Sequence, residues 1–347
     1  MTTLPVANAK FAVEVFQSLT REHSCENVVF SPVNLTSGFG LLALGSGCEQ
    51  AAEIEKVGAI KQQRFSLQYV FVSKWSTVTV PHGYIMLFLR DSKLSPSVQK
   101  FIYSLKCNHF EKAMKKIALF SLSGKIKNLL PKGSFDCLAQ LLLVNALYFK
   151  GQWDVKFDKE LTKEAPFYVH YADPVSVCIC LGFLFLLCKI LEIPYKDHEI
   201  SLLILLPTDC SPEALEQLED GLTHEHLLDW FCDLKPEDID VSIPKFSLER
   251  NLEANHYVNL PELTDHEKAD FSGATTTEHV ALTQFIHDTS FEIDEEGGEP
   301  AEAPRCPRDR RPRRECAKFV ANHPFLFFAL HHCTQSLLVF GRFSKPE

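Results

Sequence analysis

The stretch 319–347, FVANHPFLFFALHHCTQSLLVFGRFSKPE, carries the strongest fold signal in the chain. Two apolar runs, FLFFAL and SLLVFGRF, flank the short polar segment HHCTQ. Runs of this length, rich in aromatic and branched residues and separated by a few polar positions, are typical of paired strands. We therefore expect two antiparallel strands within 325–343, with His331, His332 and Cys333 in the connection between them.

Other segments indicate a mixture of strands and helices. Four more apolar, β-rich segments are bounded by turn formers, and they span residues 140–149, 200–206, 241–248 and 279–293. Apolar residues recur at helical spacing near the N-terminus, at Phe11, Ala12, Val15, Phe16 and Leu19. The same spacing marks one face of segment 212–231, at Leu215, Leu218, Leu222, Leu227 and Trp230. This pattern predicts an α+β fold in which strands adjacent in sequence pair antiparallel.

Composition indicates an ordinary soluble protein. The 347 residues are 46% apolar and 23% charged, and they contain neither a Gly/Ser linker nor an internal repeat. We therefore expect one domain spanning residues 1–347. Lys10 and Glu14 interrupt the first apolar segment, which lacks the core of a signal peptide. The twelve cysteines are scattered, so a reducing, cytoplasmic location is the default expectation, with an extracellular location reached only without a signal peptide.

The segment 175–188, VSVCICLGFLFLLC, contains no charged residue. It is shorter than the roughly 18–20 residues that span a bilayer, so we expect a buried strand or strand pair and no membrane span. Cys178 and Cys180 within it have the wrong spacing for a zinc site, and no metal site is expected.

An arginine-rich run interrupts this apolar chain at 305–314, RCPRDRRPRR. Six arginines against one aspartate give it a charge of +5, in a chain whose net charge is −10. A basic, proline-broken stretch is typical of an exposed loop that is open to proteases or to an acidic partner. It also fits a nuclear-localisation signal or a polyanion contact, or a solvated loop without function.

No pattern in the sequence indicates catalysis. A glycine-rich phosphate loop, a nucleophile elbow and an H-E-x-x-H helix are all missing from it. We therefore expect no enzyme, no catalytic residue and no cofactor.

The C-terminal stretch resembles the signature of the serpins. Further blocks similar to this family lie at 27–37, 142–157, 190–207 and 269–273. The resemblance covers most of the chain, and the form ANHPFLFF is similar to the intracellular ovalbumin-like clade. The resemblance implies the serpin fold, with three β-sheets, surrounding helices and an exposed reactive-centre loop, some elements being shortened or missing.

The segment EEGGEPAEAP at 295–304 resembles the loop hinge of the maspin-like, non-inhibitory branch of that clade. The resemblance places the reactive-centre loop at 295–319 and its nominal scissile bond at Arg311–Pro312. Because Pro312 disfavours cleavage there, the bond between Arg314 and Glu315, which follows an R-x-R-R pattern, is the more plausible site of cleavage. The hinge residues of the reactive-centre loop are then Glu295, Glu296, Gly297, Gly298, Glu299, Pro300, Glu302 and Pro304.

An inhibitory serpin inserts its cleaved loop as a new central strand of the large sheet, so alternate loop residues enter the core. If Gly298 is the first inward residue, the inward set is Gly298, Pro300, Glu302, Pro304, Cys306, Arg308 and Arg310. The prolines remove donors from a central strand, and an unpaired buried charge costs more than the 1–3 kcal/mol or so of a neutral polar group. We expect weak or unfavourable insertion.

The resemblance also assigns the region where the large sheet opens. It places Ser31, Asn34, Asn145 and His287 in the shutter and Trp153 in the breach. Asn34 stands where most serpins have serine, which alters this network.

Three functions follow from these observations. The favoured one is a monomeric, non-inhibitory serpin that binds a protein partner through the arginine-rich loop. The second is an inhibitor of trypsin-like or basic-residue-specific serine proteases that uses Arg311 or Arg314 as bait. The third is a degenerate serpin without function, because segments after Lys116 and Phe167 are shorter than in the family. No nucleic-acid partner is expected.

Overall fold

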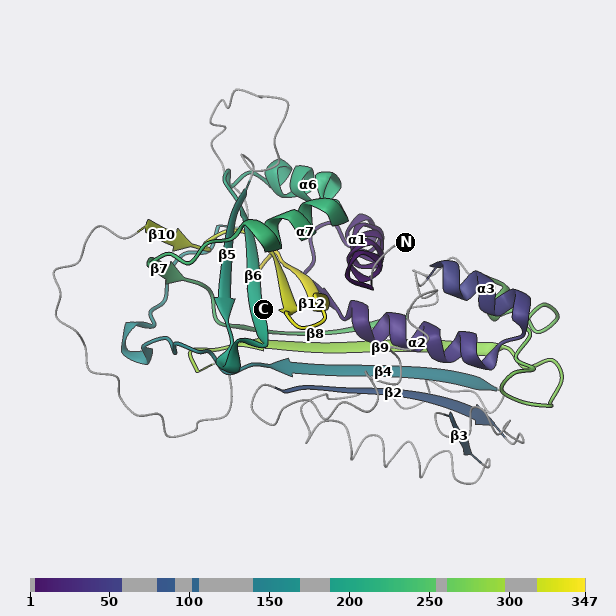
Figure 1. Cartoon of the computed structure of the whole chain (residues 1–347). Coiled ribbons are helices and arrows are strands. Elements are labelled where there is room, and N and C mark those ends of the chain that lie inside the picture. The colour runs from purple at the N-terminus through teal and green to yellow at the C-terminus, as the bar shows by residue number, and fades with distance from the viewer. Residues whose placement is uncertain are drawn as a thin grey trace.

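The large sheet has five strands in the order β3-β2-β4-β9-β8 and runs along the lower part of the molecule in Figure 1. The computed structural model describes residues 4–57, 80–90, 102–105, 140–168, 188–253, 261–296 and 317–346. The strands of the large sheet are β2 (Val80–Arg90), β3 (Ile102–Leu105), β4 (Leu141–Lys150), β8 (Phe246–Glu253) and β9 (Leu282–Ile293). β4 and β9 are parallel neighbours, and each has an antiparallel neighbour on its other side.

A second sheet has the order β1-β12-β11-β6-β5. Its strands are β1 (Val28–Phe30), β5 (Cys188–Pro194), β6 (Ile200–Pro207), β11 (Phe325–His331) and β12 (Ser336–Phe343). The antiparallel pair predicted within 325–343 is confirmed, since β11 and β12 pair from Phe325–Phe343 to His331–Ser336 around the turn at 332–335. β6 pairs with β11 and is buried along its whole length.

The third sheet consists of β7 (Ile239–Ser242) and β10 (Ala317–Val320), which are parallel. The sequence predicted one strand over 241–248, and this was wrong. Pro244 lies between β7 and β8, and proline has no amide hydrogen to donate to a strand ladder. The chain thus leaves the small sheet and enters the large one within three residues, and the described residues form three sheets in all.

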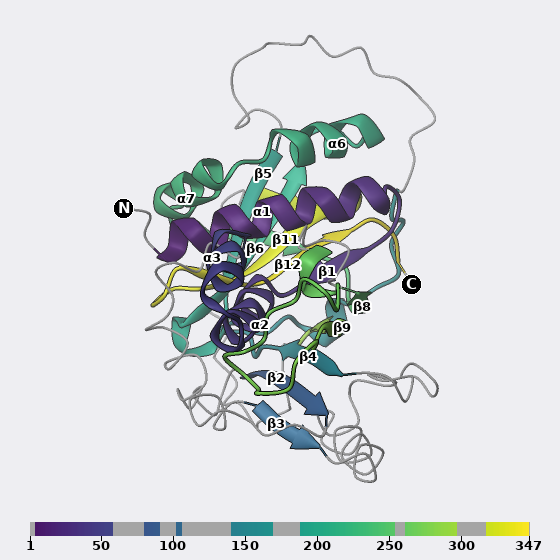
Figure 2. The same cartoon turned by 90° about the vertical axis from the view of Figure 1, so that its right-hand side faces the viewer.

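Five α-helices and three short 3₁₀ helices accompany these sheets in the described ranges. The α-helices are α1 (Leu4–Glu22), α2 (Pro32–Gly45), α3 (Cys48–Val57), α6 (Pro212–Gly221) and α7 (His224–Asp233). The 3₁₀ helices are η3 (Lys159–Leu161), η5 (Lys196–His198) and η6 (Pro261–Leu263). In Figures 1 and 2, α2 lies over the large sheet and α1 lies across β12.

The predicted helix over 212–231 is two helices. The chain breaks at Leu222, and the Thr223 hydroxyl caps α7 by accepting from the His226 amide at 3.3 Å. The predicted apolar face survives this break, because Leu218, Leu222 and Trp230 are buried.

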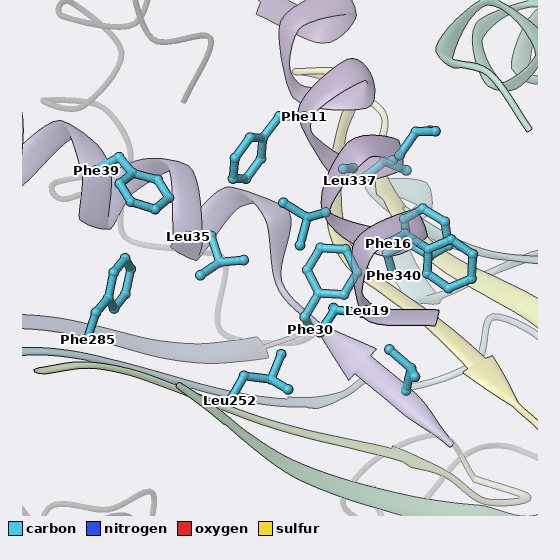
Figure 3. Close-up of a cluster of buried hydrophobic side chains, with 14 of the residues drawn as sticks. Phe11, Phe16, Leu19, Phe30, Leu35, Phe39, Leu252, Phe285, Leu337 and Phe340 are labelled. Atoms are coloured by element: carbon cyan, nitrogen blue, oxygen red, sulfur yellow. The ribbon is translucent and has the colours of Figure 1, made fainter. Parts of the chain in front are cut away.

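Aromatic side chains fill the space between the helices and the sheets, as Figure 3 shows. Phe16 of α1 stacks on Phe340 of β12 with ring centroids 4.1 Å apart. Phe39 of α2 meets Phe285 of β9 edge to face at 5.2 Å. The first helix predicted from the sequence therefore joins the core, and the α+β fold class is confirmed.

Of the apolar segment 175–188, the structure describes only Cys188, which is buried at the start of β5. The rest of that prediction, and the region after Lys116 up to residue 139, lie outside the described residues. No helix among the residues that the structure describes is long and apolar enough to cross a membrane.

Candidate functional site

Strand β9 connects the predicted shutter to the predicted loop. His287 lies in its middle, opposite Asn145 of β4, and Glu295 and Glu296 follow its end. A strand that turned back from the end of β9 and entered between β4 and β9 would be antiparallel to both. In the structure β4 and β9 pair directly from Leu141–Leu282 to Phe149–Phe291, so no strand lies between them. Parallel pairs are slightly less stable per residue than antiparallel ones, which makes this the weakest seam in the centre of the sheet.

The His287 side chain joins this seam to the helix layer. Its Nε2 accepts a hydrogen bond from the Ser31 backbone amide at 3.0 Å, and the Thr289 hydroxyl lies 3.1 Å from the same nitrogen. Because Nε2 accepts, the ring hydrogen of neutral His287 is on Nδ1, which has no hydrogen-bond partner among the described residues. Burial lowers the pKa of His287 to about 3, so the ring is neutral at physiological pH.

The two predicted asparagines connect α2 to β4. The Asn145 side-chain amide donates to the Asn34 carbonyl at 2.9 Å, and the Asn34 side-chain amide donates to the Ala146 carbonyl at 3.5 Å. The Ser31 hydroxyl caps α2 by accepting from the Asn34 amide at 3.3 Å. The structure therefore brings Ser31, Asn34, Asn145 and His287 together in one buried polar cluster, called here the shutter cluster.

Helix α2 comes unusually close to β4 above the shutter cluster. A Cβ on Gly38 would lie 2.8 Å from Asn145 Nδ2, 3.0 Å from Phe285 Cζ and 3.1 Å from Leu143 Cδ2. Only glycine allows this approach, and it is the approach that lets the Asn145 side chain reach the helix backbone. Gly38 could not be recognised from the sequence, because a glycine within an apolar helix gives no sign of which residues lie opposite it.

The predicted breach residue, Trp153, ties the end of β9 to the segment after β4. Its indole nitrogen donates to the Asp294 carbonyl at 2.8 Å, and its backbone amide donates to the Glu296 carbonyl at 3.3 Å. The Trp153 ring stacks on Tyr195 at 4.4 Å and is buried. Trp153 thus fixes the backbone at the point where the predicted loop begins.

The first two hinge residues are held by ion pairs. Glu295 accepts from Lys245 Nζ at 3.0 Å and from the Thr162 hydroxyl at 3.1 Å. A hydrogen bond from its own amide, and then the one from Lys245, lower the pKa of Glu295. Glu296 pairs with Lys159 of η3. Together with Trp153, these contacts form what is called here the hinge anchor.

Lys150 reinforces the hinge anchor from the end of β4. Its Nζ lies 2.7 Å from Glu292 Oε1 and 2.6 Å from Asp294 Oδ2. Burial lowers the pKa of Lys150, but the hydrogen bonds to the two carboxylates outweigh this effect and raise it above its ordinary value. The Tyr148 hydroxyl donates to Glu292 at 2.9 Å, and burial together with this bond raises the pKa of Tyr148 to about 12.

Sequence reasoning missed the lysines that hold this anchor. Glu292 near the end of β9 and Asp294 just past it are two residues apart, as Tyr148 and Lys150 are at the end of β4, which was a usable signal once the two strands were known to be neighbours. The remaining predicted loop residues fall within 297–316, outside the described residues. These are Gly297, Gly298, Glu299, Pro300, Glu302, Pro304, Arg311, Pro312, Arg314 and Glu315, whereas residues 317–319 of the predicted loop belong to β10.

One cluster has the residue types of a hydrolase triad without its geometry. The Ser201 hydroxyl lies 2.7 Å from His332 Nε2, and Glu192 Oε1 lies 3.3 Å from the same nitrogen. In a triad the serine contacts one nitrogen of the histidine ring and the carboxylate contacts the other. Here both contact Nε2, so Glu192 cannot orient the ring while the ring activates Ser201. No group of three or more His, Cys, Asp or Glu residues in the described ranges is arranged to hold a metal ion.

Comparison with known proteins identifies the family. The sequence model described as "Serpin (serine protease inhibitor)" matches residues 6–346. Leukocyte elastase inhibitor of Homo sapiens is 31% identical over 384 aligned positions, with all of both chains covered. Serpin B5 of Rattus norvegicus is 32% identical over 381 positions, again with full coverage. A crystal structure of maspin matches with a TM-score of 0.84 and 29% identity, over 99% of this chain and 98% of that one.

These likenesses confirm the fold expected from the sequence and the ovalbumin-like clade. The alignment with the human inhibitor has 384 positions, whereas this chain has 347 residues, so 37 aligned positions have no residue in this chain. The match covers nearly the whole chain, and the three sheets and the solved relatives agree with it. The chain belongs to the serpin family.

Proposed function

We propose that this serpin does not trap proteases by loop insertion and instead binds a protein partner through the arginine-rich run at 305–314. Likeness alone does not separate the two activities. The relative named as an elastase inhibitor is 31% identical and the one named Serpin B5 is 32% identical. The proposal therefore rests on the loop's own residues.

The feature that carries the proposal is the sequence of the loop, because alternate residues would enter the core if the loop were inserted as a strand. The seam between β4 and β9 faces a core of Leu143, Leu147, Phe149, Phe285 and Phe291 on one side. A strand entering there from Gly298 would turn Pro300, Glu302 and Pro304 toward that core. Each unpaired polar group would cost about 1–3 kcal/mol, and each proline would leave a neighbour's carbonyl without a donor.

The contacts of the hinge anchor also support the proposal, because they stabilise the conformation in which the loop is not inserted. Insertion would have to begin at Glu295 and Glu296, whose carboxylates pair with Lys245 and Lys159 and whose carbonyls accept from Phe157 and Trp153. Those contacts would be broken before any strand hydrogen bond replaced them. The intact conformation is therefore favoured by both the loop sequence and its attachment.

The test is thermal unfolding before and after limited cleavage within 305–314. An unchanged, cooperative midpoint after cleavage is the expected result, and a large upward shift would show insertion and overturn the proposal. The matched variant replaces Pro300, Glu302 and Pro304 with alanine. If these residues are what prevents insertion, the cleaved variant gains stability while the cleaved wild type does not.

Partner binding needs its own test. Replacing the six arginines of 305–314 with alanine should abolish capture of the partner by the full-length protein. Unchanged capture would place the binding surface elsewhere on the body. Cytoplasmic residence is part of the proposal, and it leaves the nuclear-import and polyanion uses of the run as alternatives that the same variant would report through localisation and heparin retention.

The second candidate is an inhibitor of trypsin-like or basic-residue-specific proteases with Arg311 or Arg314 as bait. The direct β4–β9 pairing favours it, because the seam is available to an entering strand. Incubation with trypsin decides it, since a covalent complex that survives denaturant would establish inhibition. A broad, non-cooperative unfolding transition of the intact chain would instead indicate the degenerate serpin that its shortened segments suggest.

A further inference from the structure

Cys210 and His323 form a pair outside the shutter cluster and the hinge anchor. Cys210 lies in the connection between β6 and α6, and His323 lies in the link between β10 and β11. The Cys210 sulfur is 3.5 Å from His323 Nδ1, within hydrogen-bond distance for a thiol. Neither residue takes part in the function proposed above.

The His323 ring is oriented as a base toward the thiol. Its Nε2 lies 2.9 Å from the Pro207 carbonyl oxygen, which can only accept, so the hydrogen of the neutral ring is on Nε2. Nδ1 then presents its lone pair to Cys210. Burial lowers the pKa of His323, so the neutral ring, with no proton on Nδ1, is the form present at physiological pH.

The surroundings also accommodate the ring after it has taken the proton. Asn322 Oδ1 lies 3.0 Å from Nδ1 and can only accept, so it repels the lone pair of the neutral ring and accepts a hydrogen bond once Nδ1 carries the proton. A nucleophile beside a base that a third group orients is the arrangement that activates thiols in proteins. Here Cys210, His323 and the Pro207 carbonyl fill those three places.

We propose that Cys210 is a thiol-modification site, at which a small disulfide of the glutathione type forms a mixed disulfide with the help of His323. The thiol proton passes to Nδ1 as the Cys210 sulfur attacks one sulfur of the disulfide. The disulfide bond breaks, a bond from Cys210 to one glutathione forms, and the departing thiolate takes the proton from His323. One thiol is oxidised, one half of the disulfide is reduced, and no other reactant is needed.

Exposure separates Cys210 from the other cysteines of the described ranges. Cys210 is partly exposed, whereas Cys188 is buried and burial raises the pKa of its thiol to about 11. Cys25, Cys48 and Cys333 are more exposed than Cys210. Within the described part of the chain, no histidine nitrogen lies within hydrogen-bond distance of those three sulfurs. If exposure alone decides the rate of modification, Cys210 should therefore react more slowly than Cys25, Cys48 and Cys333. If His323 activates the thiol, Cys210 should react faster than these three.

The test measures this ranking on the full-length, reduced protein. Glutathione disulfide is added, the reaction is quenched with an alkylating agent at set times, and fragment mass spectra locate each adduct. Cys210 should be modified at least about tenfold faster than Cys48, since a positioned base contributes a factor of this size or more. Modification of Cys210 at or below the rate of Cys48 would overturn the proposal.

Two variants sharpen the result. Cys210→Ser should remove the fast adduct and leave the slow ones unchanged. His323→Gln keeps a donor for the Pro207 carbonyl but loses the base, and it should slow Cys210 to the rate of the exposed cysteines. An unchanged Cys210 rate in a folded His323→Gln protein would also overturn the proposal. If that variant does not fold, the wild-type ranking of Cys210 against Cys48 decides alone.

Discussion

At His287, in the middle of β9, the described polar contacts join neutral groups and the side chain is fully buried. At Asp294 and Glu295, just past the end of the same strand, the contacts are ion pairs that reach the surface. The shutter cluster thus depends on burial and on hydrogen bonds between neutral groups, neither of which salt screens. The hinge anchor depends on charge, which salt weakens and water competes for. The same strand is therefore fixed at its centre and adjustable at its end.

The largest expected effect comes from deleting the buried ring. His287→Ala would leave the Ser31 amide without its acceptor and open a cavity against α2, so we expect a loss of about 3 kcal/mol in the free energy of unfolding. Urea denaturation measures it. His266→Ala, at an exposed position, is the control and should change stability by less than about 0.5 kcal/mol. Equal losses of stability in the two variants would show that the buried His287 ring contributes no more to the fold than an exposed histidine does.

The next prediction concerns His287 and Asp288, two adjacent residues whose titration changes the stability of the fold in opposite directions as the pH falls. The unfolded chain binds a proton at His287 below about pH 6.5, but the folded chain binds one only near pH 3, so this residue makes stability fall as the pH falls. Burial, with Glu249 nearby, raises the pKa of Asp288 to about 7, so the folded chain keeps a proton there that the unfolded chain has released. Asp288 therefore makes stability rise as the pH falls from 7 toward 4.

The two effects oppose each other in the wild type, and Asp288→Asn removes one of them. Relative to the wild type, the variant should lose about 2 kcal/mol more between pH 6.5 and pH 5, because each unit corresponds to about 1.4 kcal/mol per proton. Urea curves of both proteins across this range give the difference directly. Parallel pH profiles would show that Asp288 does not hold a proton in the folded chain.

A smaller effect tests the close approach of α2 to β4. Gly38→Ala would place a methyl group 2.8 Å from Asn145 Nδ2, and we expect a loss of about 1–2 kcal/mol from the displaced side chain. Gly45→Ala is a matched change in the same helix, since its Cβ would meet only the Ala274 Cβ at 3.1 Å. Thermal unfolding of the two variants should rank Gly38 as the more sensitive position, and the reverse order would mean that α2 can move away from β4.

The smallest effect belongs to the hinge anchor. Lys245 has 62% of its side chain exposed, so Lys245→Ala should cost less than about 1 kcal/mol in low salt and nothing measurable in 1 M salt. The expected change is in access to the hinge, seen as faster proteolysis near Glu295 than in the wild type. A loss that persisted in high salt would show that Lys245 acts through packing and would weaken the comparison drawn above.

Much of the fold could be predicted from the sequence, because the strands that become β4, β6, β9, β11 and β12 are apolar runs bounded by turn formers. The breaks inside predicted elements were missed. At Pro244 and at Thr223 one element ends and another begins within a few residues. A hydrophobic pattern judged over ten or more residues does not reveal such a short interruption. The shutter cluster was recovered through family resemblance, whereas the lysines of the hinge anchor depend on which strands are neighbours, and a single sequence does not state this.

The two links between the small sheet and the large sheet differ greatly in contour length. Three residues join β7 to β8, whereas residues 294–316 join β9 to β10, although β7 pairs with β10 and β8 pairs with β9. The short link can span about 10 Å and the long one about 80 Å at full extension. The short link therefore limits the spacing of the two sheets, whereas the length of the long link sets no comparable limit. A change in the length of 294–316 would therefore leave the spacing of the sheets unchanged, whereas a change in the length of 243–245 would alter it.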